Sequence, residues 1–311
     1  MTDTPTQPQT SISPAAWALM GLLALLWGCS FPATRAALGE VGVLTTVAFR
    51  VGEGALALWF VIALRGLPVR GGWRIVAIFA VMGLLNNVLP WSLIVWGQSH
   101  IASGLAAILN ASTAIFTVSL AALILPDERL TARKSIGVLL GLAGVVMVMG
   151  VTALRSLDLT SLGQIAVLAA SVSYGCAGVF ARKFLSGQPP EVAAAGMLTA
   201  SSSVMIPVAL WFEGAPRLDY HPTTWAALLY LGFVGSALAF LCYYRALRLA
   251  GAGNVSLVTL MIAPVSVVLG ALIFDESLSL SDYGGFLLLA AGLLVIDGRL
   301  FRRFARTQES T

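Results

Sequence analysis

Two stretches of the chain repeat each other at a fixed distance. Residues 127–144 have the sequence DERLTARKSIGVLLGLAG, and residues 275–292 have the sequence DESLSLSDYGGFLLLAAG. At this offset of 148 residues an Asp-Glu-x-Leu turn matches, together with two leucines, one alanine and two glycines of the apolar segment that follows. Gly150 matches Gly298 at the same offset. Because one offset covers a turn and an apolar segment, the pattern indicates an internal duplication.

The start of each half carries the same duplication. At an offset of 147 residues, Trp27-Gly28-Cys29 matches Tyr174-Gly175-Cys176, and Arg35 matches Arg182. The repeat therefore extends over most of the chain and predicts two similar halves.

The composition is typical of a membrane protein. Apolar residues make up 58% of the 311 positions and charged residues 10%, whereas a soluble domain carries about 25% charged residues because its surface faces water. The apolar blocks are near the length of ~20 residues that crosses a hydrocarbon core of ~30 Å. We predict an all-α integral membrane protein with ten transmembrane helices, at Ala16–Arg35, Leu44–Leu64, Ile75–Ser99, Ile101–Leu125, Ser135–Val151, Leu162–Phe184, Val192–Phe212, Thr224–Leu247, Asn254–Phe274 and Tyr283–Leu300.

Each half contains five spans, so the second half must lie inverted in the membrane. We expect a disordered cytoplasmic tail at residues 1–14, a first repeat at 15–151, an inverted second repeat at 152–300 and a basic cytoplasmic tail at 301–311. Alternate connections hold fourteen and four of the 18 Lys and Arg residues, which predicts that both termini are cytoplasmic. Inverted repeats are typical of alternating-access transporters, whose site lies near the membrane midplane where the repeats meet.

The third predicted span holds a polar cluster around a proline. Pro90 has no N–H, so it is expected to free the carbonyl of Asn86, beside Asn87 and Trp91. These groups could bind the ammonium or carboxylate of a solute. The alternative is a proline kink whose asparagines bond neighbouring helices.

Two further prolines mark breaks in other spans. Pro32 is expected to free the carbonyl of Gly28 near Ser30, and Pro264 that of Leu260 near Thr259. Pro32, Pro90 and Pro264 are hinges in the functional interpretation and tolerated kinks in the alternative one.

Some aromatic side chains lie deeper than the interfacial belt. They could stack on an apolar or aromatic solute, and ordinary helix packing is the alternative. These residues are Trp27, Trp91, Tyr174, Phe240 and Tyr243.

Acidic residues at three places in the chain have competing explanations. Glu53 lies well inside a span with Arg50 one turn before it, which suits an intrahelical ion pair or proton coupling. Asp127-Glu128 and Asp275-Glu276 are expected to cap the helix that follows in their own half, with a gate latch as the alternative.

Other functional classes lack their signatures. The sequence contains no His-Glu-x-x-His motif, and His100 and His221 lie in predicted connections, so we predict no enzyme, cofactor or metal site. Lys134 lies in a predicted loop and Lys183 at the very end of a predicted span, so neither lysine is at midspan, which disfavours phosphorylated substrates. The first span has no carboxylate that could bind a cationic drug. The spans also lack the rings of charged residues that are typical of a selective ion channel. The isoelectric point is about 9.2, but the basic residues form no continuous stripe of the kind that binds nucleic acid.

Several motifs resemble the drug/metabolite transporter superfamily in its EamA-type branch. They are Trp27-Gly28-Cys29-Ser30-Phe31, Phe49-Arg50, Leu109-Asn110-Ala111-Ser112-Thr113, the duplicated Asp-Glu-x-Leu turn and Ala263-Pro264. The resemblance covers about residues 15–300 and implies export of amino acids or other metabolites from bacterial cells, as in YddG-like aromatic amino-acid exporters. Ala114 stands where relatives commonly carry proline, which weakens the expectation of a helix break in the fourth span.

We therefore predict a secondary transporter in the bacterial cytoplasmic (inner) membrane, with an amino acid or related metabolite as solute. Export of drugs or other hydrophobic solutes is the alternative, followed by an intramembrane enzyme or a channel. The cavity is expected between the first, third, fourth, sixth, eighth and ninth spans. Its predicted substrate-binding residues are Trp27, Ser30, Asn86, Asn87, Trp91, Asn110, Tyr174, Phe240, Tyr243 and Thr259.

Overall fold

A computed structural model describes most of the chain, at residues 12–69, 71–98, 100–101, 103–149, 157, 161–217, 219–262, 264–265, 268 and 280–297. The predicted C-terminal tail, the Asp275-Glu276 turn, Gly298, the boundary at residues 151–152 and most of the predicted N-terminal tail lie outside these residues.

The first half of the chain forms five helical spans, and several of them are divided into shorter elements. Ser13 caps the first span by accepting a hydrogen bond from the backbone N–H of Ala16 at 3.2 Å, and Pro14 occupies the first turn. The elements are α1 (Pro14–Gly28), α2 (Ser30–Ala37), α3 (Val43–Arg65), α4 (Trp73–Gly83), η1 (Leu84–Val88), α5 (Leu89–Gln98), α6 (Ser103–Ala111), α7 (Thr113–Ile124) and α8 (Ala132–Met149).

The second half repeats this order. Its elements are α9 (Leu162–Phe184), α10 (Pro190–Phe212), α11 (Pro222–Leu229), η3 (Tyr230–Leu238), α12 (Ala239–Ala250), α13 (Ala252–Val255) and α15 (Leu280–Asp297). The bounds of α10 are those of α3 displaced by 147 residues, and the bounds of α15 are those of α8 displaced by 148 residues. Within the described residues, seven helices are long and apolar enough to cross a membrane, and shorter apolar helices lie at Ile108–Ile124 and Ala252–Ile262. The prediction of an all-helical membrane protein built from two repeats is confirmed.

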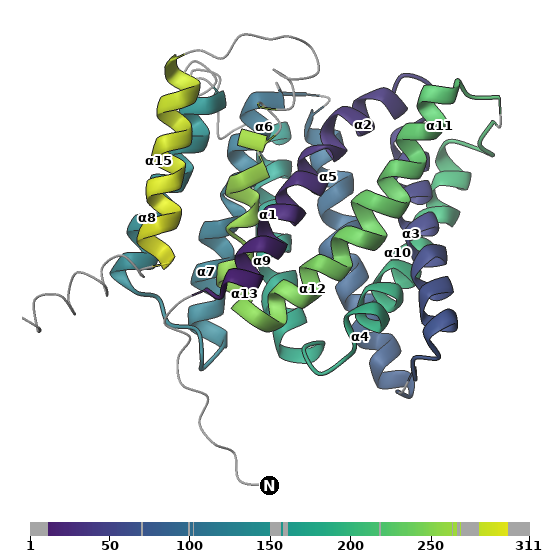
Figure 1. Cartoon of the computed structure of the whole chain (residues 1–311). Helices are drawn as coiled ribbons and strands as arrows, with labels where there is room; N and C mark the ends of the chain where they lie inside the picture. Colours follow the sequence, from purple (N-terminus) through teal and green to yellow (C-terminus); the bar gives the residue numbers. More distant parts are fainter. Residues whose placement is uncertain are drawn as a thin grey trace, which may run out of the picture.

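The two halves run in opposite directions through the bundle (Figure 1). Trp17 near the start of α1 donates a hydrogen bond to Asp297 at the end of α15 at 3.2 Å, so the first and last described helices share one end of the bundle. At the opposite end α2 packs against α11. This arrangement follows from an odd number of crossings in each half.

Repeat-related helices pack directly against each other. α8 lies against α15 at one edge of the bundle (Figure 1), and α3 lies against α10. The α8–α15 contact is a glycine seam: a Cβ atom added to Gly144 would lie 2.7 Å from the carbonyl oxygen of Gly285, and one added to Gly292 would lie 2.6 Å from that of Gly137. Small residues allow this approach, which drives helix association in lipid.

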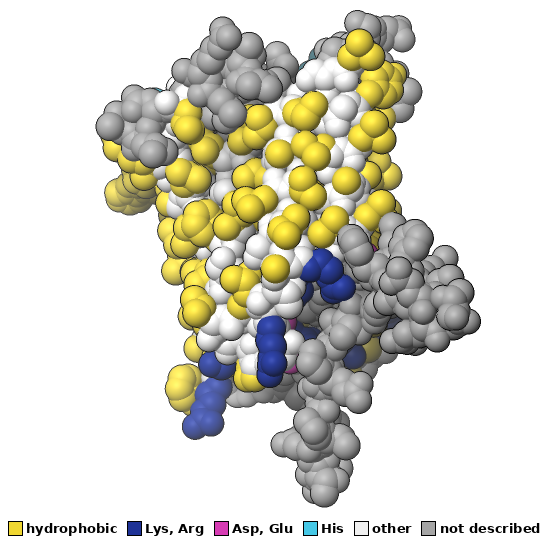
Figure 2. Space-filling model, turned by 90° about the vertical axis from the view of Figure 1, so that its left-hand side faces the viewer, with side chains coloured by type: hydrophobic (Ala, Val, Ile, Leu, Met, Phe, Trp, Pro, Cys, Tyr) yellow, Lys and Arg dark blue, Asp and Glu magenta, His cyan; other side chains and the backbone are white. Residues whose placement is uncertain are grey.

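The outer surface of this edge is apolar. Figure 2 shows hydrophobic side chains over most of the height of the bundle and Lys and Arg side chains near its lower end. Ile136, Leu139 and Leu287 are among the exposed residues of α8 and α15. Such a band is expected of a lipid-facing surface with a basic end.

Several of the described spans are interrupted rather than continuous. The first span breaks at Cys29, three residues before Pro32, as expected. The fourth span also breaks, at Ser112, although Ala114 replaces the proline: the Ser112 hydroxyl and the Ser171 hydroxyl of α9 both donate to the carbonyl of Leu109. The third and eighth spans contain the π-helical segments η1 and η3, which are repeat-equivalent.

Acidic side chains connect the two halves at the helix ends. Glu213, after α10, accepts hydrogen bonds from the backbone N–H groups of Leu44 (3.0 Å) and Thr45 (2.8 Å) at the start of α3. Glu128 accepts from Ala252 (2.6 Å) and Gly253 (2.8 Å) at the start of α13. The prediction that Glu128 caps the helix of its own half was therefore wrong.

Thr131, and not Glu128, caps the N-terminus of α8. Its hydroxyl accepts a hydrogen bond from the backbone N–H of Lys134 in the first turn of α8, at 3.2 Å. The short Thr131 side chain can reach its own helix, which leaves the carboxylate free to cross to the other half. Asp127 likewise turns to the second half and forms an ion pair with Arg182 at 3.0 Å.

Candidate solute site inside the bundle

The π-helical segment η1 places the polar groups of the third span. In η1 the backbone N–H of Leu89 donates to the carbonyl of Leu84, five residues earlier. The next donor in this pattern would be Pro90, so the carbonyl that loses its partner is that of Leu85 and not, as predicted, that of Asn86. Ser173 of α9 donates to this Leu85 carbonyl at 2.7 Å. The freed carbonyl therefore joins the third and sixth spans.

The two asparagines of η1 face α10. Asn86 donates from its amide to the sulfur of Met197 at 3.5 Å, and Asn87 donates to the hydroxyl of Ser201 at 2.8 Å. Both asparagines are buried, and the side-chain oxygen of Asn87 has no hydrogen-bond partner in the described structure. The side-chain N–H groups of both asparagines therefore bond a neighbouring helix, which was the alternative to solute binding.

A positive charge lies between the second, third and eighth spans. Arg50 is about 11 Å along α3 from Val43, at 1.5 Å per residue. Its guanidinium carbon lies 3.9 Å from the centroid of the Trp91 ring. Its Nε donates to the Ser236 hydroxyl at 3.2 Å, and its Nη2 donates to the carbonyl of Gly235 at 3.3 Å. The cation is therefore held against an aromatic face by the π-helical segment η3.

Arg50 does not pair with Glu53. Among the described residues no carboxylate forms an ion pair with Arg50, so the predicted intrahelical pair is not formed. The reason is the direction of the two side chains: Arg50 extends to Trp91 and Ser236, whereas the Glu53 carboxylate lies against Gly232, where an added Cβ atom would overlap it. One carboxylate oxygen of Glu53 is buried without a hydrogen-bond partner in the described structure.

Aromatic side chains from both halves surround this charge. Tyr174 of α9 lies next to Trp91 and within electrostatic range of Arg50. Trp27 of α1 donates from its indole to the carbonyl of Gly235 at 3.1 Å, the oxygen that also accepts from Arg50. The repeat-related Trp27 and Tyr174 therefore meet the same cluster, as the duplication predicts.

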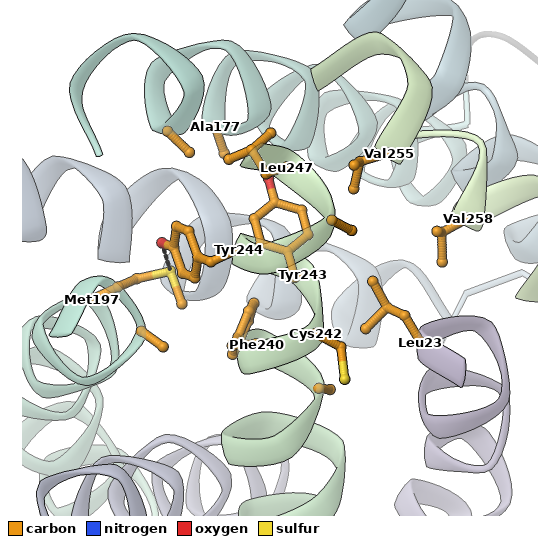
Figure 3. Close-up of a cluster of buried hydrophobic side chains, with 14 of the residues drawn as sticks. Leu23, Ala177, Met197, Phe240, Cys242, Tyr243, Tyr244, Leu247, Val255 and Val258 are labelled. Carbon is orange, nitrogen blue, oxygen red and sulfur yellow. Dashed lines mark hydrogen bonds between the residues drawn. The ribbon is translucent and has the colours of Figure 1, made fainter. Parts of the chain in front are cut away.

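Phe240 and Tyr243 extend the cluster along α12. The ring centroid of Trp27 lies 6.0 Å from that of Phe240 and 6.1 Å from that of Tyr243. Figure 3 shows both residues among packed side chains, next to Tyr244, whose hydroxyl donates to Met197 at 3.4 Å. Phe240 is only 2% exposed. Phe240 therefore packs in the core, and Trp27, which is half-buried, is the more accessible ring.

The remaining predicted residues are placed as follows. Asn110 lies beside the break in the fourth span, as does Thr113, which was not among the predicted binding residues. A buried oxygen of each has no hydrogen-bond partner in the described structure. Ser30 donates to the carbonyl of Leu26 at 3.1 Å, and Thr259 donates to that of Ser256 at 2.7 Å, so both hydroxyls bond their own helix.

Of the predicted hinges, Pro32 and Pro90 lie beside real irregularities of the helix. Pro264 is helical and buried, with residues 263, 266 and 267 outside the described part of the chain. Hinge motion at the three prolines stays a prediction.

The sequence did not single out the residues of η3. Gly235, Ser236 and Tyr230 were missed, although Gly235 and Ser236 hold Arg50 and the Tyr230 hydroxyl donates to the carbonyl of Leu26 at 2.9 Å. The available signal was the pair Gly232 and Gly235 in an apolar span, at the repeat equivalent of η1. The second span was also absent from the predicted cavity lining.

The comparison with protein families decides the identity. The model of the EamA-like transporter family matches twice, over residues 15–150 and 161–297, once in each half. The chain belongs to the EamA-like transporter family. This EamA-like protein is accordingly a multi-pass membrane transporter and not an enzyme.

Curated relatives of this EamA-like protein cover nearly its full length. It is 26% identical to the "Probable amino-acid metabolite efflux pump" of Salmonella typhimurium, over 92% of this chain and 97% of that protein. It is 28% identical to the "Probable terminal-alkyne amino-acid exporter" of Streptantibioticus cattleyicolor, over 96% and 98% respectively. A solved crystal structure with 21% identity has a TM-score of 0.79 and covers 93% of this chain and 100% of its own, which shows a shared fold.

Proposed function

We propose that this EamA-like protein is a secondary transporter that exports amino acids or closely related metabolites by alternating access. The observation that supports it best is the polar and aromatic cluster inside the bundle. Arg50 and Trp91 of the first half and Tyr174, Gly235 and Ser236 of the second meet there. In inverted-repeat transporters this is where the solute site lies.

Two properties make the cluster suited to an amino acid. It offers charged and polar donors beside aromatic faces, which match a solute with a polar head and an apolar side chain. Two curated relatives carry names that refer to amino-acid metabolites or amino acids. Aromatic and other neutral amino acids, as in YddG-like exporters, are the substrates we propose first, with Trp27, Trp91, Tyr174 and Tyr243 as contact residues.

The proposed location is the bacterial cytoplasmic (inner) membrane with both termini in the cytoplasm. The repeat-equivalent positions Ala132 and Leu280 then face opposite compartments, because they begin α8 and α15. A cysteine at Ala132 should react with a membrane-impermeant maleimide only after the cytoplasmic side is opened, and one at Leu280 should react in intact cells. Reaction of both in intact cells would contradict the inverted arrangement.

The function is tested by counterflow in proteoliposomes. Vesicles containing the purified protein and unlabelled amino acids should accumulate labelled L-phenylalanine or L-leucine transiently, and saturably, in comparison with empty vesicles. A channel would show no counterflow, and accumulation of hydrophobic cations in place of amino acids would favour the drug-export alternative. Repeating the assay with a pH gradient tests whether protons drive transport, with Glu53 as the proposed proton-carrying group.

A further inference from the structure

Arg50 carries a charge that the described protein does not neutralise. A guanidinium stays protonated in proteins, and cations inside a span normally pair with an acid or with backbone carbonyls because burial of an isolated charge is costly. Arg50 has one backbone carbonyl, one hydroxyl and one aromatic face as partners. The acid one turn away, Glu53, lies against Gly232 instead. The guanidinium thus has no ion-pair partner among the described residues where the repeats meet.

The geometry of Arg50 leaves part of its donor set available. The two hydrogen bonds run from Nε to Ser236 and from Nη2 to Gly235, and no other hydrogen bond joins Arg50 to the described residues. Arg50 as a whole residue is partly exposed. Stacking on Trp91 fixes the plane of the guanidinium. A fixed guanidinium with free N–H groups is the arrangement that binds a planar carboxylate.

We propose that Arg50 binds the carboxylate of the transported solute, and that this protein therefore prefers carboxylates over their uncharged or cationic analogues. Trp91 and Ser236 are positioning residues that orient the guanidinium. The hydroxyls of Tyr174 and Tyr230 lie within electrostatic range of the same charge and add polar partners. This inference rests on the proposed function and deepens it, because it names the chemical group by which the solute is recognised.

Binding by the purified protein tests the inference apart from transport. The probes are matched pairs that differ in one group: L-phenylalanine with L-phenylalaninamide, and 3-phenylpropionate with 3-phenylpropanamide. We expect each carboxylate to raise the melting temperature and each amide to bind at least about tenfold more weakly, the order expected for loss of a charge-assisted hydrogen bond. Equal binding of acid and amide in both pairs would overturn the role of Arg50, and so would absence of binding by every carboxylate.

Variants separate recognition from a merely structural role. Arg50→Gln should bring the acid-to-amide preference close to one. Arg50→Lys keeps the charge and should retain part of the preference. The matched control is Arg65→Gln on the same helix, where the Arg65 side chain is 58% exposed and its partner Glu191 keeps an ion pair to Arg245. If Arg50→Gln does not fold, the acid and amide pairs measured on the wild type and on Arg50→Lys still test the inference. If both variants fold and both keep the acid-to-amide preference of the wild type, the inference is overturned.

The two hypotheses can fail separately. Carboxylate-selective binding without amino-acid counterflow would remove the proposed substrate and keep the carboxylate site. Counterflow of L-phenylalanine with no preference for its acid over its amide would keep the exporter and reject Arg50 as its anchor.

Discussion

Two pairs of repeat-related helices pack directly against each other but have diverged to different degrees. The α8–α15 seam is symmetric: Gly137 meets Gly292 and Gly144 meets Gly285, so each helix gives the other the same small residues. The α3–α10 pair is asymmetric, since Arg50 and Glu53 correspond to Met197 and Ala200 at the offset of 147 residues. We infer that the symmetric pair keeps the fold and that the asymmetric pair, where only α3 carries charged residues at these two positions, serves transport.

The largest effect is expected from enlarging the seam. In Gly144→Val the Cβ atom would lie 2.7 Å from both the carbonyl oxygen of Gly285 and the backbone nitrogen of Leu289, and backbone atoms cannot move aside. We expect a loss of about 2–3 kcal/mol of stability from overpacking, seen as a lower melting temperature and reduced yield. Gly21→Val is the control, because an added Cβ at Gly21 has no neighbour within 4 Å. Equal melting temperatures for both variants would contradict the role of the seam.

A second effect, on transport, is expected at Trp91. Trp91→Ala removes the aromatic face from Arg50 without removing a charge, and a cation–π contact of ~1 kcal/mol corresponds to a rise of about fivefold in KM for L-phenylalanine counterflow. The matched control is Leu238→Ala, the repeat equivalent, whose side chain is 43% exposed. A normal KM in Trp91→Ala, or an equal rise in Leu238→Ala, would argue against asymmetry at this site.

A substitution at Glu53 tests proton coupling separately from solute movement. Glu53→Gln keeps the shape of the side chain and removes the group that gains and loses a proton. We expect flux driven by a pH gradient to fall to the level without a gradient, while counterflow stays within about twofold, since exchange needs no net proton movement. Gradient-driven flux that survives in this variant would exclude Glu53 as the proton carrier. The repeat equivalent Ala200 offers no such group.

The smallest effect is expected at an end of the bundle. The hydroxyl of Thr224 (2.6 Å) and the backbone N–H of His221 (2.9 Å) donate to Glu40 and hold the pKa of this carboxyl below its ordinary value of 4.5. A lowered pKa in the folded state contributes stability above the ordinary value that is lost as the pH falls through the lowered value.

Comparison of Glu40→Gln with the wild type checks this contribution. Glu40→Gln should lower the melting temperature slightly at neutral pH, because the carboxylate is exposed, and the difference should shrink as the pH falls below the ordinary value of 4.5. A difference that grows as the pH falls would contradict the assignment. The repeat equivalent is Gly187, which has no side chain to form this contact.

The helical spans were predictable because each needs only its own sequence. Leu162–Phe184 was predicted with the bounds of α9, and the spans around α3, α8, α10 and α15 were placed within a few residues. The break at Ser112 was harder, because it arises without a proline: the carbonyl of Leu109 is drawn to the hydroxyls of Ser112 and Ser171, and Ser171 is on another helix.

The candidate site was predictable in part of its membership but not in its contacts. Trp27, Trp91 and Tyr174 were identified from their depth and from the repeat, and they meet in one cluster. The partners of Arg50 and Asn87 could not be obtained in this way, because the sequence does not show which neighbouring helix faces a given side chain. Glu53, one turn from Arg50, was the obvious local partner, but Ser236 and Gly235 were nearer in space.

The sequence alone determined that this protein lies in a membrane and that its second half repeats the first in the opposite direction. Hydropathy and an odd number of spans depend only on local composition and on counting, so no knowledge of packing was needed. The tertiary structure alone decided where the buried charge of Arg50 is directed and that Glu128 binds the other half of the molecule. A side chain inside lipid takes its partners from whichever helices pack against it, and these helices are distant in the chain.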